Sequence, residues 1–120
     1  MPSLQWIQHA GKRILYTDIA SQNTEELLDI VELIKAEIKN EPPNSLLCLC
    51  NVKNGKTNAE INKGVKDLVK FVDPYMKMIV VIGLDGLQKI LYNSVRMFIR
   101  NKNLTVKNSR EEALAFLVEQ

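Results

Sequence analysis

The sequence predicts an α/β fold built on a mixed, mostly parallel five-stranded sheet with about four helices. Apolar runs alternate with capped amphipathic helices, some of the runs are apolar without a break, and the chain opens with a candidate hairpin. Strands that alternate with helices imply right-handed crossovers and parallel pairing. The four predicted strand-and-helix units are 13–19 with 24–40, 45–52 with 58–72, 76–83 with 85–100, and 104–107 with 110–118.

The first two strands are expected to form an antiparallel hairpin. Residues 3–8 predict the first strand, with Leu4 and Trp6 on one face. A short turn at 10–12 separates it from the second strand at 13–19, which is the spacing typical of a hairpin.

The first helix has both a start signal and a stop signal. Asn23 or Thr24 can cap it, and Glu25 and Glu26 suit its positive end. The prolines at 42 and 43 end it because neither ring can continue a helix. Its expected buried stripe is Leu27, Val31, Ile34 and Ile38.

The runs 46–50 and 78–82 predict central strands that are covered on both faces. If the strands follow sequence order with right-handed crossovers, the crossover helices fall on one face of the sheet. The other face must then be covered by the terminal segments, by a reversal of winding or by a partner chain.

The later helices also carry caps. Asn58 caps the second helix, Asp85 can cap the third, and Ser109 with Glu112 forms a capping box for the fourth. The third helix, 85–100, has apolar side chains beyond a single stripe. That pattern fits either deep burial or a contact with a partner, which includes a homodimer.

Composition limits the function classes. The chain has 120 residues, 46% of them hydrophobic, and a net charge of +2, so we expect one domain spanning 1–120 with a proper core. The weak charge does not favour nucleic acid, and no apolar run is long enough to span a membrane. No secretory signal is apparent, so we expect a cytoplasmic protein.

The cysteines and the histidine do not predict a metal centre or a catalytic group. Cys48 and Cys50 lie two apart on one strand face, a poor spacing for a disulfide and too few ligands for a metal site. We interpret them as core residues. His9, the only histidine, has no evident nucleophile or orienting partner.

The turns after the predicted parallel strands are the best candidate site, because ligands bind beyond the carboxyl ends of such strands. The turn after the third strand resembles the end of a phosphate-binding loop. However, Cys50 stands at the earlier position where that motif requires a glycine. It is therefore interpreted as a turn with an exposed lysine, or at most a single-anion site. The candidate partner or anion surface is Asn51, Lys53, Asn54, Gly55, Lys56, Thr57 and Asn58, with Asp18, Gly83 and Asp85 as secondary candidates.

The segments 11–18, 43–49, 82–84 and 109–117 resemble the STAS-like family, bacterial domains related to anti-sigma-factor antagonists and also called SpoIIAA-like. The resemblance covers essentially the whole chain. It implies a β-α superhelix and a non-enzymatic module that binds a protein partner without a cofactor. Because related folds include lipid-carrying CRAL-TRIO domains, a small apolar ligand held under the third helix is the alternative.

The classical switch of that family is a phosphorylatable hydroxyl that follows an aspartate, between the third strand and the second helix. Here residues 51–58 contain no Asp-Ser pair, and Thr57 supplies the hydroxyl in a basic, amide-rich setting. The sequence therefore predicts partner binding through this loop and the following helix, without a matching phosphosite. An enzyme that uses Asp18, Asp85 and Lys56 is the least favoured hypothesis.

Overall fold

A computed structural model describes residues 3–18, 24–52, 59–83 and 104–120. Its five strands form one sheet in the order β1-β2-β3-β4-β5. β1 and β2 are antiparallel, and every other neighbouring pair is parallel. This confirms the predicted mixed sheet with an N-terminal hairpin. The strands are β1 (Ser3–His9), β2 (Lys12–Asp18), β3 (Leu46–Asn51), β4 (Met76–Ile82) and β5 (Leu104–Val106).

The described residues include three of the four predicted helices. They are α1 (Thr24–Ile38), α2 (Ala59–Val72), which runs into a short 3-10 turn (Asp73–Tyr75), and α4 (Arg110–Leu117). α1 ends two residues earlier than expected, in a turn where the Glu41 amide donates to the Ile38 carbonyl at 2.9 Å. The predicted third helix, 85–100, lies outside the described residues.

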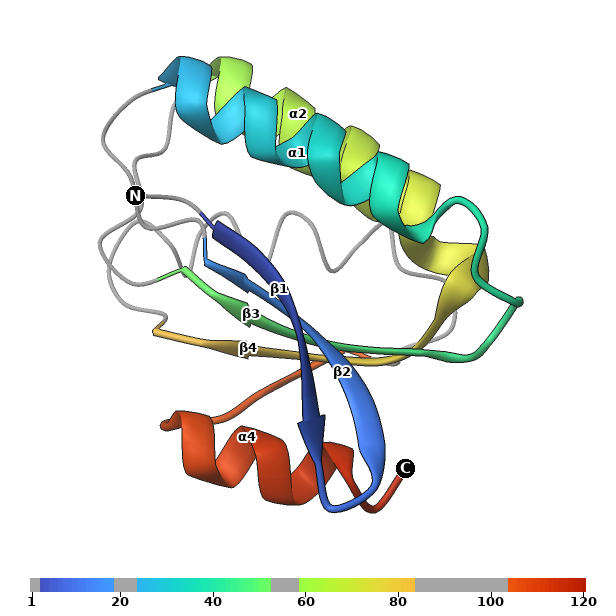
Figure 1. The fold of residues 1–120 in the computed structure, drawn as a ribbon. Helices are drawn as coiled ribbons and strands as arrows, with labels where there is room; N and C mark the ends of the chain where they lie inside the picture. Colours follow the sequence, from blue (N-terminus) through green and yellow to red (C-terminus); the bar gives the residue numbers. More distant parts are fainter. Residues whose placement is uncertain (1–2, 19–23, 53–58, 84–103) are drawn as a thin grey trace.

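The helices lie on both faces of the sheet (Figure 1). α1 and α2 cover one face, and α4 covers the other. Of the three alternatives for that second face, the terminal segment is the correct one. The cap of α4 is also confirmed, because the Ser109 hydroxyl accepts from the Glu112 amide at 3.2 Å.

Each face of the sheet has its own apolar cluster. Under α1 and α2 the buried residues include Leu15, Ile38 and Val72. Under α4 they include Ile14, Leu49, Val80 and Leu117. The neighbours Ile14 and Leu15 therefore point into opposite clusters, as expected for successive residues of a strand that is covered on both sides.

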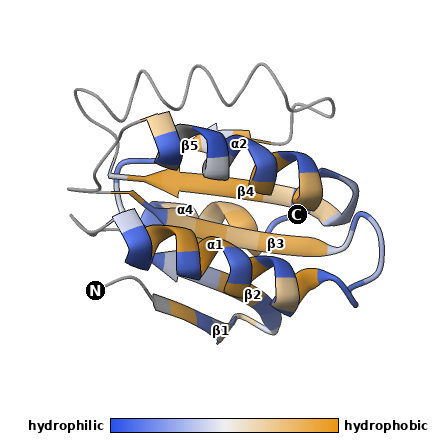
Figure 2. Ribbon diagram, turned by 90° about the horizontal axis from the view of Figure 1, so that it is seen from above, coloured by the Kyte–Doolittle hydropathy of each residue, from blue (hydrophilic) through white to orange (hydrophobic). Residues whose placement is uncertain are grey.

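The central strands are as apolar as predicted, and Figure 2 shows β3 and β4 as the hydrophobic middle of the sheet. All of β3 up to Leu49 is buried, whereas β4 alternates more, with Lys77 exposed. The predicted stripe of α1 is confirmed, because Leu27, Val31, Ile34 and Ile38 are all buried.

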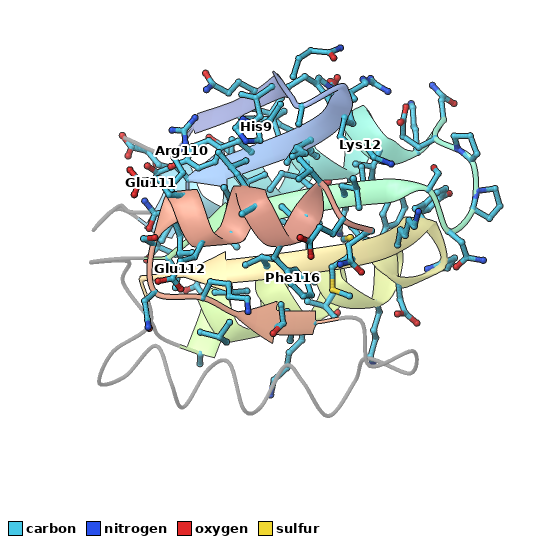
Figure 3. The ribbon with its side chains drawn as sticks, turned by 90° about the horizontal axis from the view of Figure 1, so that it is seen from below. His9, Lys12, Arg110, Glu111, Glu112 and Phe116 are labelled. Atoms are coloured by element: carbon cyan, nitrogen blue, oxygen red, sulfur yellow. The ribbon has the colours of Figure 1, made fainter. Side chains whose placement is uncertain are left out.

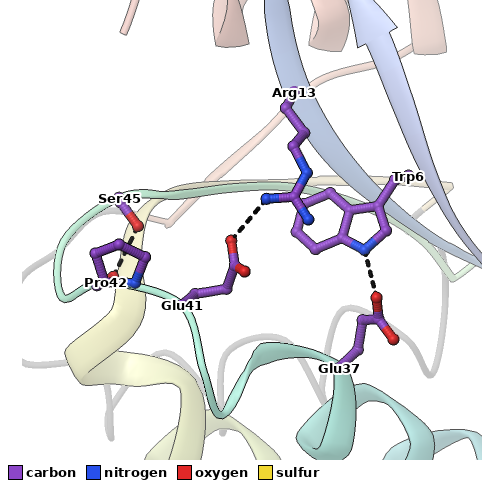
Figure 4. A network of polar contacts seen from close by, with 6 residues as sticks. All are labelled: Trp6, Arg13, Glu37, Glu41, Pro42 and Ser45. Carbon is purple, nitrogen blue, oxygen red and sulfur yellow. Dashed lines mark hydrogen bonds and ion pairs between the residues drawn. The ribbon is translucent and has the colours of Figure 1, made fainter.

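A polar network connects the hairpin to the end of α1 (Figure 4). Trp6 Nε1 donates to Glu37 Oε1 at 2.6 Å, and the Arg13 guanidinium lies 3.6 Å from the centre of the Trp6 ring. Arg13 also pairs with Glu41 at 3.0 Å. Because Arg13 is half exposed, the ion pair itself contributes little stability, and the main effect is to fix the orientation of Trp6.

Within the described ranges, no helix has the length and apolar character that a membrane span requires.

Candidate binding edge of the sheet

Three of the predicted site residues lie at the carboxyl edge of the parallel sheet. Asp18 ends β2 and pairs in register with Asn51, which ends β3 and pairs with Ile82. Gly83 follows directly with a φ of +83°, a conformation that glycine adopts without strain. The backbone continues this alignment past β3, because the Val52 amide donates to the Ile82 carbonyl at 3.0 Å.

The N-terminus of α4 lies beside this edge. Tyr16 precedes Asp18 on the same face of β2, and the Asn51 amide Nδ2 donates to the Tyr16 hydroxyl at 3.5 Å. The Arg110 guanidinium lies over the Tyr16 ring, with 4.8 Å between Cζ and the ring centroid. Figure 3 views this face and shows Arg110 at the start of α4. Tyr16 and Arg110 therefore join the candidate edge with Asn51.

Tyr16 and Arg110 are not among the residues that the sequence predicts for this edge. Tyr16 has one available signal, since a residue two positions before Asp18 shares its strand face. For Arg110 the sequence offers no signal, because tertiary packing alone decides that the start of α4 lies beside the ends of the strands.

On the opposite face, the thiols of β3 lie against Thr17. Cys48 is buried and Cys50 is half-buried, and Cys50 pairs in register with Thr17. Burial is the main cause that raises the pKa of both thiols, to about 11 for Cys50, and the Asp18 carboxylate adds to the rise at Cys50. A neutral thiol is a poor nucleophile, so these groups are suited to packing, as the sequence predicts.

The other predicted site residues lie outside the described residues, whereas His9, which the sequence does not favour as a catalytic group, is described. The seven predicted residues that are not described are Lys53, Asn54, Gly55, Lys56, Thr57, Asn58 and Asp85. The region of the predicted apolar pocket under the third helix also lies outside the described residues. His9 lies at the far end of the sheet from Asp18, because β1 pairs His9 with Lys12 and Ser3 with Asp18. In the described ranges, no group of three or more His, Cys, Asp or Glu residues is arranged to hold a metal ion.

The fold is similar to a solved structure. That structure is an uncharacterised protein of the DUF3478 family, with a SpoIIAA-like fold, from Shewanella loihica PV-4. The match has a TM-score of 0.77 and covers 97% of this chain and 93% of that chain, at 12% sequence identity. At this identity the likeness concerns the fold alone, and the chain has a SpoIIAA-like fold, as the resemblance implied. No family model matches the sequence, and no curated protein matches it.

Proposed function

We propose that this chain is a non-enzymatic, STAS-like binding module that engages a protein partner through the loop and helix after β3. The main support for the proposal is the position of Asn51 in the register of the parallel strands. It ends β3 between Asp18 of β2 and Ile82 of β4, so β3 ends in the middle of the carboxyl edge of the sheet, shortly before residues 53–58 of the sequence. Ligands of parallel sheets bind beyond that edge.

The described groups at the edge favour binding over covalent chemistry. Asn51, Tyr16 and Arg110 supply an amide, a phenol and a guanidinium, which recognise polar surfaces through hydrogen bonds. The nearby thiols are kept neutral on the opposite face of the sheet.

The partner surface that suits this edge is acidic. Residues 53–58 contribute Lys53 and Lys56 together with the amides of Asn54 and Asn58. Arg110 adds a further positive charge on the described side. Complementary charge speeds association and excludes wrong partners, so carboxylates on the partner are expected opposite these groups.

The test is affinity capture from cells of the source organism with three forms of the chain. Lys56→Glu with Asn58→Glu reverses the charge of the proposed surface, and Lys39→Glu is the control, because Lys39 is exposed beyond α1. We expect at least one protein captured by the wild type and the control to be lost from the double variant, while the melting temperature falls by only a few degrees through loss of the predicted Asn58 cap. An identical set of captured proteins would exclude this surface.

A further inference from the structure

Among the residues that the structure describes, the outer edge of β1 has none of the features that usually protect a strand edge. β1 comes first in the sheet order, and no strand of the described part pairs on its outer side. Its seven residues stay in unbroken register with β2, and none of them is Asp, Glu, Lys, Arg or Pro. Edge strands are normally kept short, charged, bulged or interrupted by proline, and the opposite edge strand β5 has only three residues. Alternate residues of β1 therefore turn backbone N–H and C=O groups outward.

One side of α1 faces β1 and carries a ridge that we call the acidic ridge, formed by Asp29, Leu33 and Glu37. The indole N–H of Trp6, on β1, donates a hydrogen bond to Glu37 (Figure 4). This hydrogen bond shows that the side of α1 that carries Glu37 faces β1. Leu33 precedes Glu37 by four residues and is its neighbour on the helix surface, and Asp29 follows four residues further toward the start of α1, turned further from the sheet. In the view of Figure 2, β1 lies outside α1 at the margin of the molecule.

The acidic ridge combines charge with exposed apolar surface. Leu33 is 56% exposed, more than any other large hydrophobic residue among those described. Asp29 and Glu37 are exposed on either side of it. The hydrogen-bond partner of Glu37 is the neutral indole of Trp6, and the Arg13 guanidinium that lies over this ring forms its ion pair with Glu41.

We propose that the β1 edge and the acidic ridge together bind an extended peptide segment of a partner protein, in which basic residues alternate with apolar ones. Backbone hydrogen bonds to β1 would add a sixth strand to the sheet. Side chains on one face of the added strand would point to the ridge, where Lys or Arg can pair with Asp29 and Glu37 and lay its methylene stem on Leu33. The side chains between them would lie beside Ile7, which packs half-buried against the cluster under α4.

Charge disfavours a second copy of this chain as the occupant. Antiparallel pairing of β1 with its own copy would bring the two acidic ridges face to face across the twofold axis. Like charges held opposite one another are destabilising, whereas a basic segment is attracted. This surface is separate from the carboxyl edge proposed above, and a failure at either surface leaves the other proposal standing.

The test uses a defined peptide, acetyl-Lys-Val-Arg-Val-Lys-Val-Arg-amide, and a control in which Glu replaces each basic residue. Each is titrated into the full ¹⁵N-labelled chain, and backbone amide shifts and hydrogen exchange are followed. We expect saturable binding of the basic peptide alone, with shifts on β1 and α1 and slower exchange of alternate β1 amides. Asp29→Lys with Leu33→Lys should weaken binding by about tenfold or more. The matched control Glu119→Lys, exposed beyond α4, should bind as the wild type does.

Several results would overturn the proposal. They are equal binding of the two peptides, shifts that avoid β1, no binding of the basic peptide, or full affinity in the ridge variant. A doubled mass of the free chain that Leu33→Lys abolishes would assign the edge to a second copy instead. Because Asp29 and Leu33 are exposed, loss of folding does not explain a negative result, and the circular dichroism spectrum of each variant checks this point.

Discussion

Thr17 and the two cysteines beside it illustrate how position along a strand decides the chemistry of a residue. Leu15, Thr17, Cys48 and Cys50 share one face of the sheet because side chains alternate along each strand. This alternation is readable in the sequence, so the shared face of the cysteines and their role in packing could be predicted. The contact of Tyr16 with Arg110 could not be, since 94 positions separate the two residues and only the return of α4 brings them together.

The raised thiol pKa values predict a loss of stability at high pH. The folded chain keeps Cys50 neutral to about pH 11, whereas the thiol of the unfolded chain ionises near its ordinary pKa of 9.0. The stabilising contribution is therefore complete below pH 9 and is lost as the pH rises from 9 through 11. The loss is about 1.4 kcal/mol per pH unit for this thiol.

Urea unfolding of the wild type and of Cys50→Ala between pH 8 and pH 11 measures this effect. The other titratable groups are common to both proteins, so the difference between the two reports the removal of Cys50, together with its effect on the pKa of Cys48. The wild type should lose more free energy of unfolding above pH 9 than the variant does. Parallel curves for the two proteins would contradict the assignment.

At the scale of secondary-structure elements, α1 and α2 approach each other closely at Gly64. A Cβ at this position would lie 2.8 Å from Cδ2 of Leu28, closer than real contacts allow, so the glycine leaves room for the leucine. The helices themselves were predictable from their apolar periodicity and their caps. The close approach was not, because a glycine within a helical pattern does not indicate which neighbour lies against it.

A double-mutant cycle on Gly64 and Leu28 tests this contact. In Gly64→Ala the gain in helix propensity, about 1 kcal/mol, is offset by the displacement of the Leu28 methyl group. Placed in the background of Leu28→Ala, the same substitution meets no methyl group and should stabilise the chain. Unfolding free energies should therefore give a coupling of about 0.5 kcal/mol or more, and additive values would show that the helices are not in contact there.

For the whole molecule, the alternation of strands and helices was sufficient to predict the sheet and its mostly parallel pairing. The unbroken apolar character of residues 46–49 correctly placed β3 between two covered faces. Which element covers the second face depended on packing, because α4 is short and its sequence does not indicate the side of the sheet on which it lies. The candidate edge was predictable for Asp18 and Asn51 for a general reason, namely that carboxyl ends of parallel strands share one edge.

Hydrogen exchange followed by mass spectrometry tests whether a protein partner binds at the carboxyl edge. The chain is measured alone and in complex with the protein that the Lys56→Glu and Asn58→Glu comparison identifies. Binding at this edge predicts slower exchange over residues 51–58 and the first turn of α2, with β1 unchanged. Protection confined to β1 and α1, or to α4, would contradict the claim and place the partner elsewhere on the molecule.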